Sequence, residues 1–377
     1  MAIFLINCSN LKQGGGLQVA DSVCRELKLF QQHYFVVVLS SSFPDTLSVI
    51  SDFPNIELYT YDIQNNLKTL FLGRDAYLDG LVEEKKVDAV LTIFGPSRWR
   101  PRCKHLCGFA RAQLIKNVNP NVNANFRERL TLAIWRWGFR RSSDTFYTEN
   151  QYISSMLPKL LGDVRVFTVT NYYNQVFDKP ELWKKKTLPD FDGVTLLTIS
   201  NAYPHKNLEI AAEVTRILKK EHPDFRFRFV YSIEREQLKA DLSGIEEHFV
   251  FIGTVDISEC PSLYRQSDIA FQPTLMECFT ATYPEAMRME VPIVTTDLEF
   301  ARGLCGDAAC YYSAMDAKSC AEAIYKMATD KEYVNNLVVN GKKQLKNFDN
   351  YEQRAEKLVM ILEDMVSKKA DSNGVIY

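Results

Sequence analysis

Short apolar runs that alternate with helical patterns from end to end constrain this chain more than any other feature. Helical spacing of apolar residues is clear over 17–27 and 208–220. The apolar runs are rich in Val, Ile and Phe, and they cover residues 3–8, 34–39, 87–94 and 164–170, then 194–200, 225–231, 249–253, 268–272 and 291–296. Near-continuous apolar strands of this length are typical of a parallel sheet that helices cover on both faces. The pattern therefore predicts an α/β protein.

The alternation is interrupted once, over residues 173–193, where Lys, Pro and Asp cluster. Polar, turn-forming stretches are typical of loops, so we interpret this one as a linker between two lobes. A chain of 377 residues is also too long for a single compact core. We therefore expect two doubly wound lobes that face a central cleft. The expected parts are an N-terminal acceptor-binding lobe over 1–172, the linker over 173–193, a C-terminal lobe over 194–350, an amphipathic helix over 351–367 and a loose polar tail over 368–377.

The composition excludes several classes of protein. Lys and Arg total 45 against 47 Asp and Glu, so the basic surplus of a general nucleic-acid binder is missing. No apolar run approaches the roughly 20 residues of a membrane-spanning helix, and the first residues lack the basic start of a signal peptide. The nine cysteines are scattered and odd in number, which indicates reduced thiols. We expect a cytoplasmic protein with no nucleic-acid partner.

Three glycines, Gly14, Gly15 and Gly16, follow the first apolar run and lead into the first predicted helix. Glycines let the backbone approach a ligand closely, and a helix amino terminus offers unpaired N–H groups to an anion. The spacing matches neither a P-loop nor the GxGxxG fingerprint. A flexible surface turn is the alternative interpretation.

A lysine, Lys206, stands in the segment Pro-His-Lys-Asn that follows the first apolar run of the second lobe. Pro204 and Asn207 fit a turn at the start of a helix. A lysine at this junction would place a positive charge where a phosphate could bind. An exposed lysine at a helix entry is the alternative.

Two carboxylates, Glu277 and Glu285, stand eight positions apart between a strand that ends at Pro273 and the next buried strand. We place Glu277 on a loop and Glu285 on the helix that follows, where both can face the cleft. Sugar hydroxyl groups donate hydrogen bonds readily to carboxylates, which only accept. A pair of ordinary helix carboxylates, one favoured by the helix dipole and one solvated, is the alternative.

Together these segments resemble glycosyltransferase family 4. The Glu277-x7-Glu285 pair lies between a D-I-A-F-Q-P strand and an E-A-M helix that leads to V-P-I-V. The glycine loop and the segments P-H-K-N-L, F-I-G-T-V and S-L-Y-R-Q-S-D-I stand in the order of that family. The resemblance covers the second lobe well and the first lobe loosely. It implies a retaining glycosyltransferase of the GT-B fold, whose C-terminal helix packs back toward the first lobe.

The resemblance also implies a role for each site residue. Glu285 would accept hydrogen bonds from the ribose of a nucleotide sugar, Glu277 would face the donor sugar, and Lys206 would neutralise the leaving diphosphate. The other implied positions are the backbone amides at Gly14, Gly15 and Gly16 and at Phe279, Thr280 and Ala281, the base-flanking residues Gly253, Thr254 and Val255, and His205 and Asn201 beside the lysine. Because lysine and helix termini supply positive charge, no metal or other cofactor is expected.

Several positions depart from the family pattern. Asn201 and His205 stand where relatives often carry arginines, and Thr280 stands where glycine is usual. A neutral histidine would neutralise the diphosphate less well. His105 is the candidate for a first-lobe histidine near the donor sugar, although Phe109 or Ala110 can align there instead. A structural role for His105 is the alternative that we favour.

Two other groups of residues are candidates for binding roles. Cys103, His105 and Cys107 lie close in sequence, but no second Cys/His pair follows at the spacing of a structural zinc site, so no metal is expected there. Residues 126–141, from Phe126 to Arg141, hold five arginines and two tryptophans. Such a helix can rest on an anionic membrane surface. An ordinary helix that packs its tryptophans inward is the alternative that we favour.

The leading hypothesis is therefore an enzyme that moves a sugar from a nucleotide-diphosphate sugar to a glycan or lipid-linked acceptor, in the synthesis of a cell-surface polysaccharide or glycolipid. A sugar-nucleotide epimerase of the same fold is one alternative, and it would need no acceptor. A two-lobed sugar-binding protein that closes by a hinge is another, and it would bind without turnover.

Overall fold

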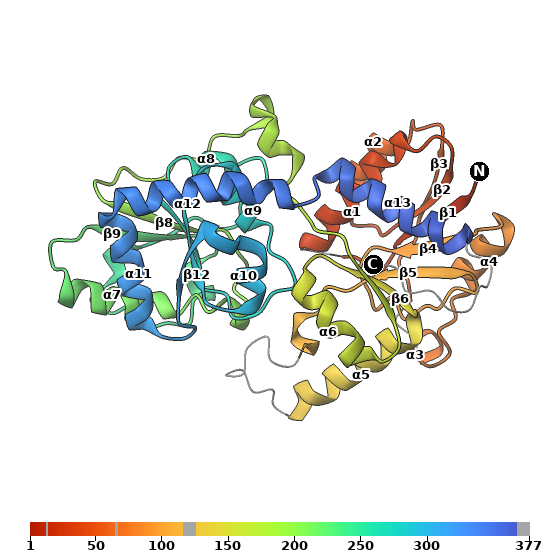
Figure 1. Cartoon of the computed structure of the whole chain (residues 1–377), viewed down its shortest axis with the longest axis horizontal. Coiled ribbons are helices and arrows are strands. Elements are labelled where there is room, and N and C mark those ends of the chain that lie inside the picture. Colours follow the sequence, from red (N-terminus) through yellow and green to blue (C-terminus); the bar gives the residue numbers. More distant parts are fainter. Residues whose placement is uncertain (13, 65–66, 116–125, 368–377) are drawn as a thin grey trace. The chain divides into compact units, whose positions relative to one another are not determined.

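The computed structural model of the protein describes residues 1–12, 14–64, 67–115 and 126–367 and divides into two compact units (Figure 1). Of the described residues, unit 1 holds those up to 115, then 126–171 and 349–367. Unit 2 holds Tyr172–Phe348. The tail predicted over 368–377 lies outside the described residues.

Unit 1 is built on a seven-stranded sheet with the order β3-β2-β1-β4-β5-β6-β7, and every neighbouring pair is parallel. The order reverses between β1 and β4, as in a doubly wound sheet. The strands are β1 (Ile3–Cys8), β2 (Tyr34–Leu39), β3 (Ile56–Thr60), β4 (Ala89–Thr92), β5 (Lys104–Gly108), β6 (Thr145–Thr148) and β7 (Arg165–Thr168). The sequence patterns indicated four of these strands and missed β3, β5 and β6, which are short and partly polar.

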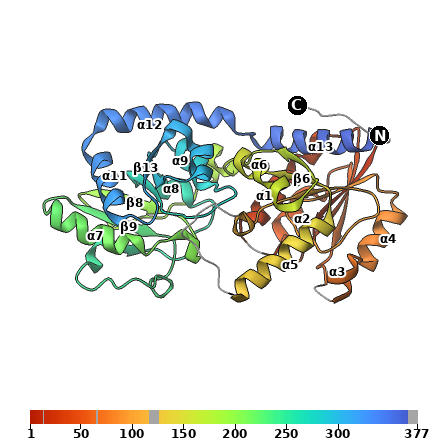
Figure 2. The same ribbon diagram turned by 60° about the horizontal axis from the view of Figure 1, so that its bottom comes forward.

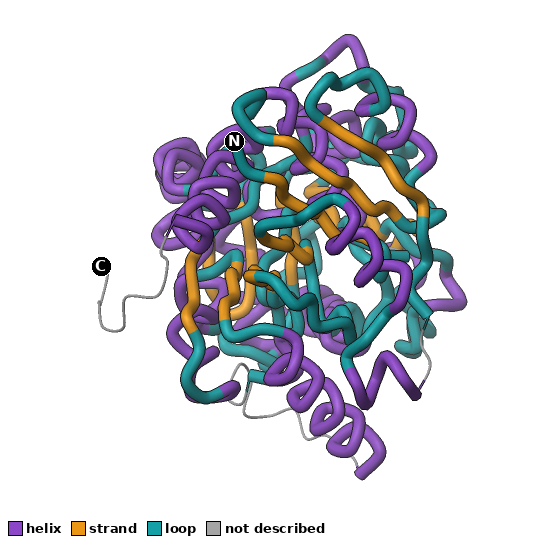
Figure 3. Tube along the Cα trace, turned by 90° about the vertical axis from the view of Figure 1, so that its right-hand side faces the viewer, coloured by secondary structure: helices purple, strands orange, loops and turns teal. Residues whose placement is uncertain are grey.

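Both faces of this sheet are buried, because successive side chains on a strand point to opposite faces. Phe4 and Ile6 belong to one apolar cluster, and Leu5 belongs to another. Figure 3 shows the strands (orange) among the helices (purple). The helices are α1 (Gly15–Glu26), α2 (Pro44–Ile50), α3 (Leu67–Leu72), α4 (Ala76–Glu84), α5 (Phe126–Ser142), α6 (Gln151–Leu161) and α13 (Tyr351–Ser367).

The C-terminal helix α13 packs on unit 1, as the sequence analysis expected. Figures 1 and 2 both show it beside the elements of this unit. Leu358 and Leu362 are buried in the same cluster as Phe4 and Ile6. A helix at the end of the chain thereby contributes to a core that the start of the chain begins.

Unit 2 has a six-stranded parallel sheet with the order β10-β9-β8-β11-β12-β13. Its strands are β8 (Val194–Thr198), β9 (Phe227–Tyr231), β10 (Phe249–Phe251), β11 (Ile269–Gln272), β12 (Ile293–Thr296) and β13 (Ala309–Tyr312). Its helices are α7 (Ile210–Glu221), α8 (Cys260–Tyr264), α9 (Thr282–Arg288), α10 (Glu299–Cys305), α11 (Ala317–Thr329) and α12 (Lys331–Gln344). The two sheets confirm the prediction of two doubly wound α/β lobes.

Residues 173–193, which the sequence analysis interpreted as a linker, lie within unit 2. The indole Nε1 of Trp183 donates to the carbonyl of Val176 at 2.7 Å, and the guanidinium of Arg265 lies 4.4 Å from the centre of the Trp183 ring. The Lys186 amide donates to the Ser262 hydroxyl at 3.0 Å. A polar composition indicates an irregular backbone, but it does not reveal whether that backbone docks on a neighbouring surface.

None of the helices in the described ranges is long and apolar enough to cross a bilayer. All nine cysteines lie in these ranges, and none of them forms a disulfide bond.

Candidate functional site

Two loops lie side by side at the carboxyl edge of the unit 2 sheet, because β8 and β11 are neighbouring parallel strands. Ligands bind at this edge in open α/β sheets. The Leu275 amide donates to the carbonyl of His205 at 2.7 Å. This bond fastens the loop after β11 to the loop after β8.

Lys206 and Glu277 form the central contact of the site. The Nζ of Lys206 lies 2.5 Å from Oε1 of Glu277, and the two side chains are only 17% and 12% exposed. The hydroxyl of the buried Thr274 donates to the same oxygen at 3.0 Å, and the Thr274 carbonyl accepts from Thr296 at 2.7 Å. The carboxylate is therefore held in place by a charged and a neutral donor. A cation and an anion stand together, so the pair as a whole is neutral.

The backbone that positions Lys206 is a short 3-10 turn over Pro204–Lys206. It ends at Asn207, whose φ of 51° is left-handed, a conformation that Asn tolerates better than most residues. The His205 ring stacks on Tyr203 with 5.7 Å between centroids. Burial lowers the pKa of His205 from its ordinary value, so the ring is neutral at pH 7. Asn201 is exposed on the same loop.

Glu285 is buried on α9, where the hydroxyl of Tyr264 donates to its Oε2 at 3.1 Å. Burial raises the pKa of Glu285 to about 7, and the hydrogen bond from Tyr264 lowers it by a smaller amount. The side chain can therefore exist as a neutral acid or as a carboxylate near neutral pH. As a carboxylate it is a strong acceptor for the hydroxyl groups of a ligand.

The pKa of Glu285 has a consequence for stability. Its ordinary value is 4.5, so between pH 4.5 and 7 the unfolded chain has lost a proton that the folded chain keeps. Stability from this group is therefore present at low pH and falls as the pH rises, by about 3 kcal/mol in all. We expect Glu285→Gln to remove this slope, so that the variant melts progressively higher than wild type as the pH rises from 5 to 8. Paired thermal melts across this range measure the difference.

The comparison between variant and wild type is the control in this experiment. Burial also raises the pKa of Glu149 in unit 1 to about 7, but Glu149 titrates in both proteins and cancels in the difference. A difference in melting temperature that stays constant from pH 5 to 8 would show that Glu285 is ionised throughout.

The residues between the two carboxylates lead into α9 and form its first turn. The ring of Phe279 meets the ring of Phe348 edge-on, with 5.9 Å between the ring centres. The hydroxyl groups of Thr280 and Thr282 are 2.9 Å apart. Among the described residues, none accepts a hydrogen bond from the N–H groups of Phe279, Thr280 and Ala281. These amides are available to an anion, as the first amides of a helix commonly are.

Gly253, Thr254 and Val255 follow β10 at the same edge, with β9 between them and β8. Gly253 has a φ of 65°, a left-handed conformation that favours glycine. A Cβ atom there would lie 2.6 Å from Oε1 of Glu234, whose side chain would have to move. The carbonyl of Thr254 accepts from Nζ of Lys186 at 3.5 Å.

Gly14, Gly15 and Gly16 belong to unit 1, where they begin α1. Gly14 is the N-cap residue with a φ of 78°, which explains a glycine there. A Cβ at Gly15 would meet nothing within 4 Å, whereas a Cβ at Gly16 would approach Leu11 and Phe94 to about 3.5 Å. The first turn of α1 carries no acidic side chain.

His105 is buried in β5 with both ring nitrogens in contact with partners. Its Nδ1 lies 2.7 Å from the carbonyl of Ser142, and its Nε2 lies 2.9 Å from the hydroxyl of Thr92. Burial lowers its pKa to about 4. These contacts favour the structural role over a role in binding a sugar. In the described ranges, no three His, Cys, Asp or Glu side chains gather as metal ligands do, at Cys103 and Cys107 or elsewhere.

Two residues that contact the carboxylates escaped the sequence analysis. Thr274 stands three positions before Glu277, and Tyr264 stands in the S-L-Y segment on α8. A threonine and a tyrosine are common in cores, so nothing in their spacing marks them. Only the proximity of β8, β11 and α8 to the two acids reveals them.

The sequence of unit 2 matches a known protein family. Residues 179–344 match the family model described as glycosyl transferases group 1. Over 149 residues, 39% of this chain, the sequence is 24% identical to a phosphatidyl-myo-inositol mannosyltransferase of Mycobacterium leprae. The match spans only 40% of the length of that relative.

Solved structures show the fold of the whole chain. A sucrose-phosphate synthase from Thermosynechococcus elongatus superposes with a TM-score of 0.72 at 13% identity, covering 98% of this chain and 100% of that one. The HepE protein of Anabaena, in complex with UDP and glucose, gives a TM-score of 0.65 at 14% identity over 97% of this chain and 100% of its own. The fold is GT-B, with two Rossmann-like α/β lobes.

Proposed function

We propose that this protein is a retaining glycosyltransferase of the family 4 type, which moves a sugar from a nucleotide-diphosphate sugar to a glycan or lipid-linked acceptor. One observation carries the proposal: Lys206 and Glu277 meet at the carboxyl edge of the sheet in the unit whose sequence matches group 1 glycosyltransferases. The GT-B fold and the buried carboxyl of Glu285 agree with it.

In this proposal each group of the site has one task. Glu285 accepts hydrogen bonds from the ribose, and Tyr264 holds its other oxygen. The available amides at Phe279, Thr280 and Ala281, with Lys206, bind the diphosphate. Glu277 faces the sugar. Fixed donors aimed at a developing negative charge are a large source of rate enhancement, so the cationic end of the Lys206–Glu277 pair is the part that favours departure of the diphosphate.

In the proposed reaction, negative charge develops on the leaving diphosphate, beside the positive charge of Lys206. The bond between the anomeric carbon and the diphosphate oxygen breaks, and its electron pair stays on the diphosphate. The acceptor hydroxyl attacks the same face of the sugar and gives its proton to the departing diphosphate, so the configuration is retained. The residues of unit 2 supply the positive charge for this step without a metal. The cleft between the two lobes, with Gly14, Gly15 and Gly16 on its acceptor side, stays a prediction.

Two findings support the choice of substrates. The HepE structure holds UDP and glucose, which favours a uridine donor, and the mannosyltransferase of Mycobacterium leprae is named for a lipid acceptor. We therefore place the reaction in the cytoplasm, at the inner face of the membrane, in the synthesis of a cell-surface polysaccharide or glycolipid.

Nucleotide binding provides the first test. A ligand that binds only the folded state raises the melting temperature, and it adds about 2.7 kcal/mol of stability at a hundred times its Kd. We expect UDP to raise the melting temperature, and 2′,3′-dideoxy-UDP to raise it much less, because the carboxylate of Glu285 accepts from the ribose hydroxyls. In Glu285→Gln the difference between the two nucleotides should largely disappear.

This pair of nucleotides separates the role of Glu285 from a general loss of folding. If GDP or ADP stabilises the protein and UDP does not, the proposed base is wrong but the fold of the site stands. If no nucleoside diphosphate stabilises the wild type, or if Glu285→Gln still distinguishes UDP from its dideoxy form, the proposed donor site is wrong.

Product analysis separates the enzyme classes. A transferase consumes the nucleotide sugar in proportion to acceptor and releases nucleoside diphosphate. An epimerase changes the sugar while it stays on the nucleotide, with no acceptor present, and a binding protein leaves the nucleotide sugar unchanged.

A further inference from the structure

The outward side of α5 carries an exposed apolar row. Phe126, Leu130 and Ile134 are 82%, 57% and 41% exposed. They stand four residues apart, which places them on one face of the helix. The opposite side of α5 is anchored by the buried Phe139, and the guanidinium groups of Arg136 and Arg140 donate to the carbonyl of Leu160 on α6.

The neighbouring helix α3 continues this row. Its last residues, Phe71 and Leu72, are 55% and 58% exposed. The Phe71 ring meets the Trp137 ring of α5 edge-on at 6.0 Å, and the guanidinium of Arg141 stacks on Trp137 at 4.6 Å. We call the five exposed side chains the apolar stripe: Phe126, Leu130, Ile134, Phe71 and Leu72.

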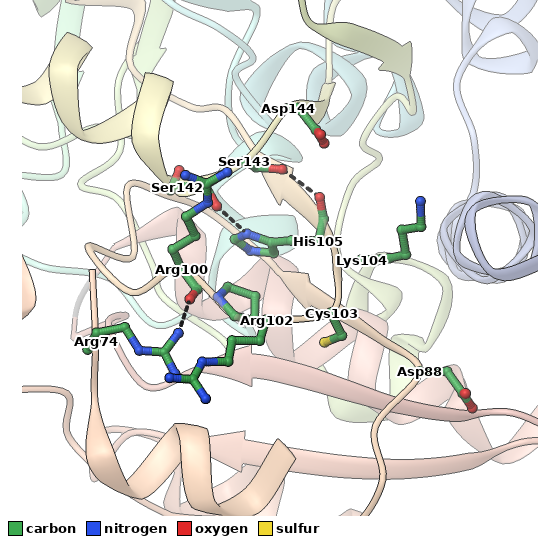
Figure 4. Close-up of a pocket in the computed structure, with 11 residues that line it drawn as sticks. Arg74, Asp88, Arg100, Arg102, Cys103, Lys104, His105, Ser142, Ser143 and Asp144 are labelled. Atoms are coloured by element: carbon green, nitrogen blue, oxygen red, sulfur yellow. Dashed lines mark hydrogen bonds between the residues drawn. The ribbon is translucent and has the colours of Figure 1, made fainter. Parts of the chain in front are cut away.

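A basic pocket adjoins the end of α3. The Arg100 amide donates to the carbonyl of Gly73 at 2.8 Å, and the Arg74 guanidinium donates to the carbonyl of Arg100 at 3.2 Å. The pocket has a volume of about 640 Å³ and reaches the end of α5 at Ser142 (Figure 4). Its basic side chains form what we call the basic rim: Arg74, Arg100, Arg102 and Lys104.

Acidic partners neutralise only part of the basic rim. Arg74 pairs with Asp79 at 2.8 Å, and Arg102 approaches Glu83 at 3.4 Å with both side chains well exposed. Arg100 and Lys104 form no ion pair with any residue in the described ranges. The pocket is also lined by two acids that have other contacts: Asp88 accepts from the Ile3 amide, and Asp144 accepts from the Thr145 hydroxyl.

The charge of this surface differs from that of the whole chain, whose formal net charge is −2. The helix α5 holds five arginines against one glutamate, and residues 98–104 hold three arginines and a lysine with no acid. Exposed apolar side chains flanked by arginines match an anionic bilayer, where apolar groups enter the headgroup region and basic groups contact lipid phosphates. A second copy of the same surface would bring like charges together, so symmetric pairing through it is disfavoured.

We propose that the apolar stripe and the basic rim together dock unit 1 on an anionic lipid bilayer. The stripe enters the headgroup region, and Arg100 and Lys104 bind lipid phosphates. The inference deepens the proposed function, on which the location at a membrane rests, by naming the surface that docks. Docking needs no nucleotide sugar, so its test can fail or succeed independently of the transfer reaction.

The test is co-sedimentation of the full chain with vesicles of phosphatidylcholine, with and without phosphatidylglycerol. We expect binding only with phosphatidylglycerol. Binding should weaken as the salt concentration rises from about 0.05 to about 0.5 M, because salt screens the attraction between exposed charges. Each basic residue near an anionic surface contributes about fivefold in affinity, so Arg100→Gln/Lys104→Gln should bind about 25-fold more weakly. Phe126→Ser/Leu130→Ser/Ile134→Ser should lose at least about tenfold, and this loss should persist at high salt.

A matched variant controls for the loss of exposed apolar surface in general. Leu182→Ser/Val339→Ser/Met360→Ser removes three side chains that are also about half exposed but lie outside the stripe. It should bind vesicles as wild type does. The proposal is wrong if wild type does not sediment with phosphatidylglycerol, if the stripe variant binds equally well, or if the control loses as much. Sedimentation velocity that shows a dimer abolished by the stripe substitutions would instead assign this surface to a second copy.

Discussion

Replacing Lys206 with methionine is expected to lower kcat/KM for sugar transfer by about 100- to 1000-fold, the loss seen when a fixed donor to a developing negative charge is removed. Methionine keeps the length and apolar stem of the side chain and removes only the charge. In the structure, this charge is only slightly exposed and sits 2.5 Å from Glu277, so it acts in a partly desolvated place. The measurement is initial rates with the nucleotide sugar that the binding test selects.

A double variant separates catalysis from folding in this experiment. Lys206→Met leaves the carboxylate of Glu277 without its cation. The unpaired carboxylate destabilises the loop, apart from any effect of the substitution on catalysis. Lys206→Met/Glu277→Gln removes both charges, and it should recover melting temperature without recovering activity. Activity of Lys206→Met within tenfold of wild type would show that the lysine does not stabilise the leaving diphosphate.

The largest expected effect on stability is that of Arg354→Met, which should cost about 3–5 kcal/mol. Arg354 is buried on α13, its guanidinium donates to the side-chain oxygen of Asn171, and it lies near the buried carboxyl of Glu149. Losing the cation leaves Glu149 without charge compensation and raises its pKa further. Denaturant unfolding followed by a probe in unit 1 measures the loss.

Position 357 on the same helix provides the control. Lys357 pairs with Asp349 at 2.6 Å but is half exposed, so Lys357→Ala should cost less than about 1 kcal/mol. Glu149→Gln/Arg354→Met should be more stable than Arg354→Met, because no buried carboxyl is then left without the nearby positive charge that eases its ionisation. Equal losses for Arg354→Met and Lys357→Ala would contradict the idea that the buried guanidinium holds α13 on unit 1.

Arg354 also contacts Asn171, which lies where the chain leaves unit 1 for unit 2. Asn171 is the last residue of unit 1 before Tyr172, and Asp349 is the first after Phe348. The Asp349 amide donates to the Thr170 hydroxyl at 2.6 Å, and the Thr170 amide donates to the Asp349 carboxylate at 2.9 Å. The two crossing segments are therefore fastened to each other within unit 1.

The strands were predictable where their sequence is continuous and apolar. Runs such as 3–8 and 34–39 became β1 and β2 with the same bounds, because a strand buried on both faces needs apolar side chains at every position. The Lys-His-Leu-Cys-Gly strand β5 and the Thr-Phe-Tyr-Thr strand β6 were missed, since polar residues interrupt them. Their neighbours in the sheet supply the hydrogen bonds that fix them as strands.

The sequence by itself determined the α/β alternation and the division into two lobes. It also placed Lys206, Glu277 and Glu285 after or beside strands of the second lobe. Periodicity and turn signals carry this information, because they act between residues that are close along the chain. Only the tertiary structure decided that Lys206 and Glu277, 71 residues apart, form an ion pair, that Tyr264 and burial set the pKa of Glu285, and that residues 173–193 belong to unit 2. These contacts depend on which strands become neighbours and on how much water is excluded, and no local pattern encodes either.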